Sequence, residues 1–137
     1  AAYWALANTD EVIASGDNAE FGSIGAMVTI DKEGLEKYRT RFSSFYGETA
    51  PQKNASSRSA LEGDFSLFQK EADQMTKNFQ DAISGIRPLR GSRETIKETL
   101  SGKMFSGSDA KRNGLVDSIG NLRYAVKRVN SLKSKYK

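Results

Sequence analysis

The 137-residue chain is long enough for one hydrophobic core and too short for two ordinary domains, so we expect a single domain over residues 1–137. It contains no cysteine and no histidine, which excludes disulfides, zinc–thiolate sites and every catalytic triad or dyad that uses histidine. The formal net charge of +4 is uneven, because residues 121–137 hold six basic residues and no acidic one.

The N-terminal segment predicts a helix followed by a strand. Residues 1–8 are rich in alanine and predict a short, mostly buried helix, in which Tyr3 and Trp4 are expected to be core residues rather than substrate contacts. Residues 11–14 favour a short strand, and residues 15–18 have the composition of a turn.

The next part of the chain predicts further strands around one helix. Residues 26–30 are apolar and β-prone without polar alternation, so we expect a strand that is covered on both faces. Asp31 is expected to cap a helix over residues 32–38, and residues 40–46 alternate well enough for another strand. Residues 47–60 are polar and aperiodic, which predicts a surface loop.

The second half of the chain contains the clearest helical periodicity. Apolar side chains recur every three or four residues over 65–86, which predicts an amphipathic helix that Asp64 opens and that ends near Arg87 and Pro88. Further predictions are a helix capped by Ser92, a strand at 103–105, a helical turn over 108–114 and a final amphipathic stripe over 122–136. Helices mixed with strands in this order favour an α/β fold class.

Two glycine-bracketed segments carry the strongest functional signal. The first is Gly22-Ser23-Ile24-Gly25, and the second combines Gly107 with Gly114-Leu115-Val116-Asp117. Taken alone, the first is weak, because it lacks the lysine of a phosphate-binding loop and because Ser23 is not in the Gly-x-Ser-x-Gly pattern of a nucleophile elbow. Together with Ala1-Ala2-Tyr3 and Lys53, and in this order, the segments resemble the signal peptide peptidase A family of serine–lysine proteases. That family includes head-maturation proteases of some phages.

The absence of histidine agrees with this resemblance. A serine hydroxyl needs a base to remove its proton, and a lysine can serve when burial or nearby cations lower its usual pKa of about 10.4. Serine–lysine catalysis therefore needs no histidine, metal or cofactor, and we expect none here.

The resemblance implies a fold, an activity and a set of site residues. The fold would be the C-terminal part of a ClpP/crotonase-like α/β protein, and the activity that of a serine endopeptidase. Lys53 would be the general base, with Ser56 and Ser57 as supporting residues and the backbone N–H of Ala1 as one oxyanion donor. The family's serine would fall immediately before Ala1, so we expect this chain alone to be inactive. Lys32 and Lys103 are the competing lysines, and both fit ordinary surface roles.

The resemblance also implies partners and substrates. Substrates would be extended polypeptides such as signal peptides or phage capsid and scaffold protein. Partners would be further copies in a ring or a complementing N-terminal half. Localisation would be cytoplasmic for a phage enzyme, and membrane-associated or periplasmic for a cellular one, with any membrane anchor outside this chain.

Two alternatives from other functional classes remain at this stage. One is a non-catalytic assembly module of the same fold that oligomerises through its helical stripes. The other is nucleic-acid binding through the basic residues of 121–137, which ranks last because the segment lacks aromatic side chains placed for base stacking. Cations that favour a helix C-terminus are the simpler explanation for that segment, although they could also meet an acidic lipid surface or an acidic neighbour.

Overall fold

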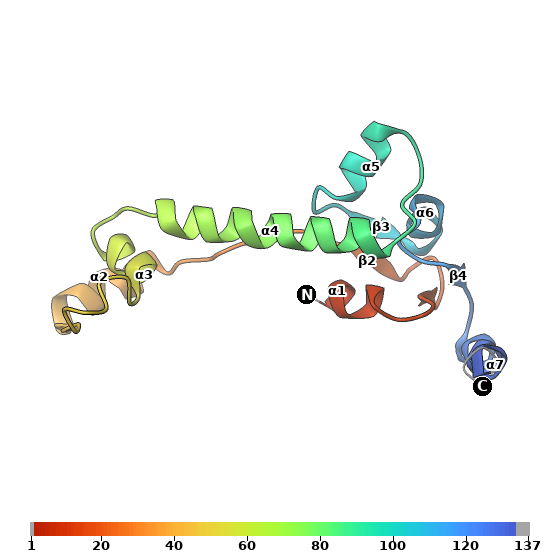
Figure 1. Cartoon of the computed structure of the whole chain (residues 1–137), viewed down its shortest axis with the longest axis horizontal. Coiled ribbons are helices and arrows are strands. Elements are labelled where there is room, and N and C mark those ends of the chain that lie inside the picture. Colours follow the sequence, from red (N-terminus) through yellow and green to blue (C-terminus); the bar gives the residue numbers. More distant parts are fainter. Residues whose placement is uncertain (1, 134–137) are drawn as a thin grey trace. The chain divides into compact units, whose positions relative to one another are not determined.

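The computed structural model describes residues 2–133, which form two compact units (Figure 1). Unit 1 comprises residues 2–25 and 77–133, and unit 2 comprises residues 26–76. The boundary between them falls within the longest helix, so each unit is described by itself.

Unit 1 combines helices with two small sheets. Its strands are β1 (Ile13–Ala14), β2 (Glu20–Gly22), β3 (Met104–Ser106) and β4 (Ser118–Ile119). Strand β1 pairs in parallel with β4, and β2 pairs antiparallel with β3. The helices are α1 (Ala2–Ala7), the second part of α4 (Ser66–Ile86), α5 (Arg93–Thr99), α6 (Gly107–Asn113) and α7 (Leu122–Leu132).

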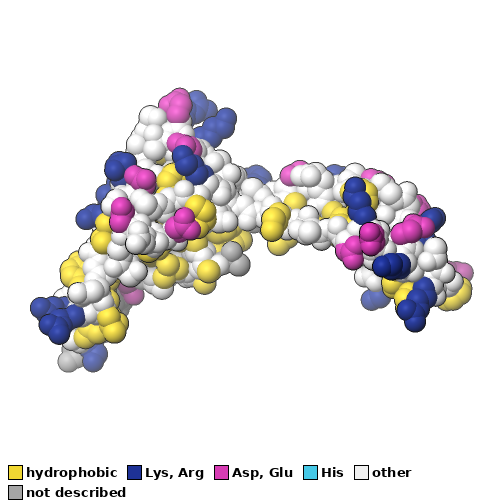
Figure 2. Space-filling model, turned by 180° about the vertical axis from the view of Figure 1, so that it is seen from behind, with side chains coloured by type: hydrophobic (Ala, Val, Ile, Leu, Met, Phe, Trp, Pro, Cys, Tyr) yellow, Lys and Arg dark blue, Asp and Glu magenta, His cyan; other side chains and the backbone are white. Residues whose placement is uncertain are grey.

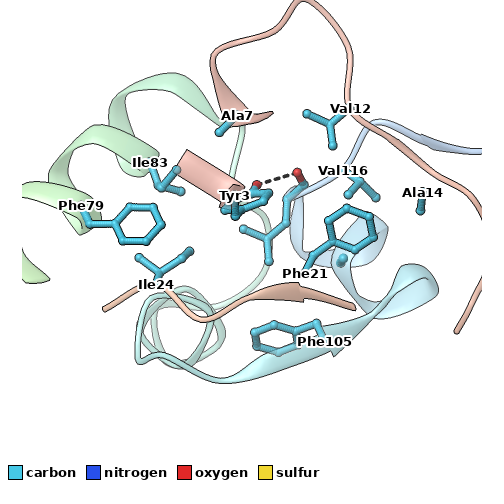
Figure 3. Close-up of a cluster of buried hydrophobic side chains, with 12 residues drawn as sticks. Tyr3, Ala7, Val12, Ala14, Phe21, Ile24, Phe79, Ile83, Phe105 and Val116 are labelled. Carbon is cyan, nitrogen blue, oxygen red and sulfur yellow. Dashed lines mark hydrogen bonds between the residues drawn. The ribbon is translucent and has the colours of Figure 1, made fainter. Parts of the chain in front are cut away.

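The core of unit 1 brings together segments from both ends of the chain (Figure 3). Tyr3 of α1 meets Phe21 of β2 edge to face, with ring centroids 6.4 Å apart, and Trp4 stacks on Phe79 of α4 with centroids 4.8 Å apart. Aromatic pairs in these arrangements stabilise a core beyond the area that they bury. The complete cluster consists of Tyr3, Ala7, Val12, Ala14, Phe21, Ile24, Phe79, Ile83, Phe105, Ala110, Leu115 and Val116.

Unit 2 is helical and contains little buried apolar surface. Its helices are α2 (Lys32–Arg41), α3 (Ala55–Leu61) and the first part of α4. The only apolar side chains that are buried among its described residues are Ala60 and Ala72. The large side chains of Met27 and Phe45 are 87% and 94% exposed.

Most predicted helices are confirmed, including their caps. Asp31 accepts a hydrogen bond from the Gly34 N–H at the start of α2, Ser92 accepts one from the Thr95 N–H at the start of α5, and Gly114 ends α6 in the left-handed conformation. The predicted stripe over 65–86 corresponds to α4. Asp64 precedes this helix and accepts a hydrogen bond from the N–H of its first residue, Ser66. Capping side chains satisfy backbone groups that a helix end leaves unpaired.

Two predicted strands in unit 2 are wrong. Residues 26–30 pair with no other described strand, and Met27 is exposed rather than covered. Residues 40–46 are also not a strand, because α2 continues to Arg41 and the following residues are irregular. A β-prone composition states a local preference, whereas a strand requires a partner that the local sequence does not specify.

Two smaller predictions also need correction. The loop expected over 47–60 contains the start of α3 at Ala55. The first helix is not mostly buried, since Tyr3 and Ala7 are its buried residues and Leu6 is exposed. A mixture of helices with small sheets is compatible with the predicted α/β class. The ClpP/crotonase-like assignment and the single domain over 1–137 stay predictions.

Candidate functional site

Helix α1 is fixed to the second glycine segment by a buried tyrosine. The Tyr3 hydroxyl donates a 2.6 Å hydrogen bond to the Leu115 carbonyl oxygen, and both residues belong to the core (Figure 3). Burial raises the pKa of Tyr3 to about 12, although the nearby Arg87 guanidinium acts in the opposite direction. Tyr3 is therefore an uncharged anchor for α1, as expected of a core residue rather than a substrate contact.

Asp117 links three segments of unit 1. Its Oδ2 accepts a 2.7 Å hydrogen bond from the Val12 N–H, and its own N–H donates to the Val12 carbonyl oxygen at 2.9 Å. Its Oδ1 lies 2.8 Å from Nη2 of Arg87, in an ion contact that is not aligned as a hydrogen bond. The Arg87 side chain is only 5% exposed, and its Nε donates to the Gly114 carbonyl oxygen at 3.4 Å. The aspartate of the Gly-Leu-Val-Asp segment thus holds β1, β4 and the end of α4 together.

The first glycine segment makes a tight turn after β2. Gly22 has a φ of 126°, and a Cβ there would lie 2.2 Å from the Lys103 carbonyl oxygen. Ser23 has a φ of 51° and donates its backbone N–H to the same oxygen at 3.1 Å. Ile24 is fully buried, and Gly25 is half-buried. The glycine at position 22 is therefore required by close backbone approach, whereas the Ser23 side chain remains exposed.

The N-terminal end of α6 packs directly on the turn at residues 15–18. A Cβ at Gly107 would lie 2.3 Å from the Gly16 carbonyl oxygen, so a larger residue would push the two segments apart. Asp17 accepts a 2.8 Å hydrogen bond from the Ser108 N–H, and hydrogen bonds from Ser108 hold the pKa of this carboxyl below its usual range. The pairing of β2, which ends at Gly22, with β3, which directly precedes Gly107, joins the two glycine segments.

A pocket of about 240 Å³ lies between α1 and the turn after β2. Its apolar walls include Leu6, Phe21 and Met104, and the Glu20 side chain is at its edge. The full lining is Ala2, Tyr3, Leu6, Glu20, Phe21, Gly22, Ser23 and Met104. Sequence reasoning missed Leu6, Glu20 and Met104 as pocket residues, and it treated Arg87 only as the end of a helix. Their roles depend on pairing between distant segments, for which the local sequence carried no signal.

Lys53 lies in unit 2, in an exposed turn that precedes α3. Its neighbour Asn54 adopts the left-handed conformation with a φ of 53°. Ser56 donates a short hydrogen bond to Glu71 of α4, and Ser57 is exposed. Gln52 and Asn54, on either side of Lys53 in the sequence, line an open pocket of about 460 Å³ together with Ser56, Ser57 and Glu71.

The competing lysines are engaged elsewhere. Lys103 forms an ion pair with Glu98 and lies 5.5 Å from the centroid of the Phe105 ring. Lys32 begins α2 and lies 5.9 Å from the centroid of the Phe65 ring. Both positions fit the surface roles expected from the sequence.

The structure brings the predicted motif residues of unit 1 together, and it places the predicted base in the other unit. Gly22, Ile24, Gly107, Leu115 and Asp117 all take part in packing or backbone contacts within unit 1. Ala1 lies outside the described residues, so its role as an oxyanion donor stays a prediction. The roles of Lys53, Ser56 and Ser57 also stay predictions.

Residues 2–133 contain neither a metal-binding cluster nor a membrane-spanning helix. No group of three acidic side chains within 2–133 is arranged to hold a metal ion. None of the helices over these residues has both the length and the apolarity needed to cross a membrane.

Comparisons with known proteins give a consistent result. The family model described as Peptidase family S49 matches residues 1–135. Among curated proteins, Protease 4 of Haemophilus influenzae is 29% identical over 133 residues. The alignment covers 95% of this chain and 21% of the relative, so the chain spans about a fifth of that relative's length.

Proposed function

We propose, from the premise that the chain belongs to peptidase family S49, that it forms part of a serine endopeptidase with a serine–lysine dyad. The resemblance inferred from the ordered motifs is confirmed at the level of this family and of a Protease 4 relative. A relationship to phage enzymes in particular stays a prediction.

The observation that carries the proposal is the match of the whole described chain to a peptidase family, in a stretch of 137 residues without histidine. A base that this chain contributes to the nucleophile must therefore be a residue other than histidine. Lys53 is the lysine that the family pattern favours. It lies in an exposed turn of this chain, so we expect the burial that a lysine base requires to come from the part of the site that carries the serine.

In the proposed mechanism, the neutral Lys53 amine accepts the proton of the serine predicted immediately before Ala1 as the serine oxygen attacks the scissile carbonyl carbon. The resulting ammonium returns this proton to the leaving amine, which yields an acyl-enzyme. The neutral amine then activates a water molecule that hydrolyses the ester. The backbone N–H of Ala1 would donate to the oxyanion, the position at which such donors contribute most to acyl transfer.

Unit 1 supports the proposal as a rigid frame for α1. Tyr3, Trp4 and Ala7 fix this helix to the core. Catalytic donors require such preorganisation, because a displacement of about 1 Å lowers the rate substantially. The pocket lined by Leu6, Phe21 and Met104 adjoins the same helix, and we propose that it receives an apolar side chain of an extended polypeptide substrate.

The test uses a chain in which the predicted serine and the segment that carries it precede Ala1. Cleavage of an unstructured polypeptide is compared between this parent, its serine-to-alanine variant and Lys53→Ala. We expect both variants to cleave at least about 10³-fold more slowly than the parent. Lys70→Ala is the matched control, because Lys70 is exposed in the same unit and lies on α4.

Undiminished cleavage by Lys53→Ala would remove this residue from the mechanism. The same assay on Lys32→Ala and Lys103→Ala would then identify the base. No cleavage by the serine-bearing parent would instead favour a non-catalytic assembly module.

A further inference from the structure

Helix α7 exposes an apolar stripe to solvent. None of its residues is buried, and Leu122, Val126 and Val129 are 80%, 53% and 61% exposed. Their spacing of four and three residues places them on one face of the helix. A helix that is strongly divided into apolar and polar faces normally covers its apolar face with another surface.

The charges on α7 have one sign. The helix and its C-cap carry Arg123, Lys127, Arg128 and Lys133 without an acidic residue. Arg128 is neutralised by Glu11, since its Nε lies 2.8 Å from Glu11 Oε2. The other three cations are exposed and form no ion pair with a residue that the structure describes. Figure 2 shows cationic side chains beside apolar ones over α7, at the lower left.

The contacts of α7 with the rest of unit 1 leave Leu122 and Val126 free. Asn121 caps the helix by accepting a hydrogen bond from the Tyr124 N–H, and the Arg128–Glu11 pair ties it to the segment before β1. A pocket of about 320 Å³ on this side is lined by Ala125, Val129 and Leu132 of α7, together with Ile13 and others. At 100° per residue, Leu122 and Val126 project from a different side of the helix than Arg128 does.

The charge of α7 distinguishes between possible occupants of this stripe. If the α7 helices of two copies packed on each other, both would carry cations and no acidic residue, and such like-charge contacts are unfavourable. A surface with anionic groups outside and an apolar interior could contact both the cations and the exposed apolar side chains of α7. Amphipathic helices with basic residues beside an apolar face bind at the boundary between lipid headgroups and acyl chains.

We propose that α7 is an interfacial helix that docks unit 1 on a bilayer containing anionic phospholipids. Leu122 and Val126 enter the headgroup boundary, while Arg123, Lys127 and Lys133 contact the phosphates. This proposal does not depend on the peptidase mechanism, because it concerns residues that take no part in the proposed dyad.

The test measures co-sedimentation of the 137-residue chain with vesicles. Vesicles of phosphatidylcholine alone are compared with vesicles that contain about a quarter phosphatidylglycerol. We expect binding only to the anionic vesicles, with partition at least about tenfold weaker for the double variant Arg123→Glu/Lys127→Glu. Arg93→Glu/Lys97→Glu is the matched control, because these exposed cations have the same four-residue spacing and the same change in charge on α5.

A second variant separates insertion from simple charge attraction. Leu122→Ser/Val126→Ser keeps every cation, and we expect its partition into anionic vesicles to fall at least about tenfold. Phe45→Ser is its control, since Phe45 is exposed in unit 2. Unchanged binding by either α7 variant would overturn the proposal, as would lipid-independent self-association of the chain that the Leu122→Ser/Val126→Ser variant abolishes.

Discussion

The two units of this chain differ in how they use their apolar side chains. Unit 1 packs a cluster of twelve buried residues around Phe79 and Ile83, whereas the buried apolar residues described in unit 2 are the two small side chains of Ala60 and Ala72. Regions with few buried contacts open locally at low free energy. The difference indicates that unit 1 is a stable frame and that unit 2, which contains Lys53, is held by weaker local interactions.

The family signatures follow the same division. The glycine segments and Asp117 lie in unit 1, where close backbone contacts and a partly buried ion pair explain them without reference to catalysis. Lys53 has no comparable packing role in unit 2, since it is exposed. Substitutions in unit 1 should therefore change stability, and substitution of Lys53 should change activity alone.

The largest expected effect is the loss of an aromatic side chain from the frame. Phe79 is 3% exposed and stacks on Trp4, so Phe79→Ala should lower the free energy of unfolding by about 3–5 kcal/mol. Phe45→Ala should leave it within about 0.5 kcal/mol, because Phe45 is 94% exposed in unit 2. Urea denaturation measures both, and equal losses would contradict the division into a packed frame and a loosely packed unit.

The next effect concerns ion pairs in the two units. Asp117→Ala leaves the buried Arg87 guanidinium without its partner and should lower the free energy of unfolding by about 3 kcal/mol. Glu36→Ala breaks an exposed pair with Arg39 in α2, and we expect no measurable change. A wild-type denaturation midpoint for Asp117→Ala would show that this contact does not hold the frame.

A glycine pair provides a comparison at the same backbone angle. Gly114 in unit 1 and Gly63 in unit 2 both have a φ of 85°, but only at Gly114 would a Cβ meet backbone, 2.2 Å from the Pro88 carbonyl oxygen. Gly63→Ala should lose about 1 kcal/mol of stability from the left-handed conformation alone. Gly114→Ala should lose about 2 kcal/mol more than that, because Pro88 must move. Thermal unfolding measures the predicted difference. Similar losses of stability in the two variants would indicate that the Pro88 backbone moves away from the new Cβ at little cost.

The smallest effect is a dependence of stability on alkaline pH. The pKa of Tyr3 is about 12 in the folded chain, against 10.0 for a tyrosine in the unfolded chain. The unfolded chain therefore loses the hydroxyl proton first as the pH rises. The contribution of Tyr3 to stability is therefore complete below pH 10 and is lost progressively up to about pH 12. Tyr3→Phe should make the decline of the urea midpoint over this range shallower. An identical decline in the variant would assign it to other groups.

Local sequence signals predicted the helices of both units well. Asp31, Asp64 and Ser92 each accept the expected hydrogen bond from the first turn of a helix, because capping depends on residues within three positions. The apolar stripe of α4 could also be recognised from the sequence, since the apolar spacing of a helix lies within one continuous segment.

Strands were predicted less well than helices, since those expected at 11–14 and 103–105 are present as β1 and β3 but β2 and β4 were missed, and the frame contacts were not accessible in this way. Residues 26–30 have β-forming composition, yet no partner strand pairs with them in the described part of the chain. The Arg87–Asp117 pair joins positions 30 residues apart, and Tyr3 reaches Leu115 across almost the whole chain. The motif residues of the site were found through their order in the sequence, whereas their packing roles became apparent only when distant segments were placed together.

Native-state hydrogen exchange tests the contrast between the two units most directly. We expect amides of α4 at residues 79–83 to exchange only with global unfolding, and amides of α2 at residues 35–41 to exchange at least about 100-fold faster through local opening. Lys53→Ala should leave both sets of rates unchanged. Equal protection of α2 and of the Phe79 segment would contradict the account, because it would show that both units open as one equally stable structure.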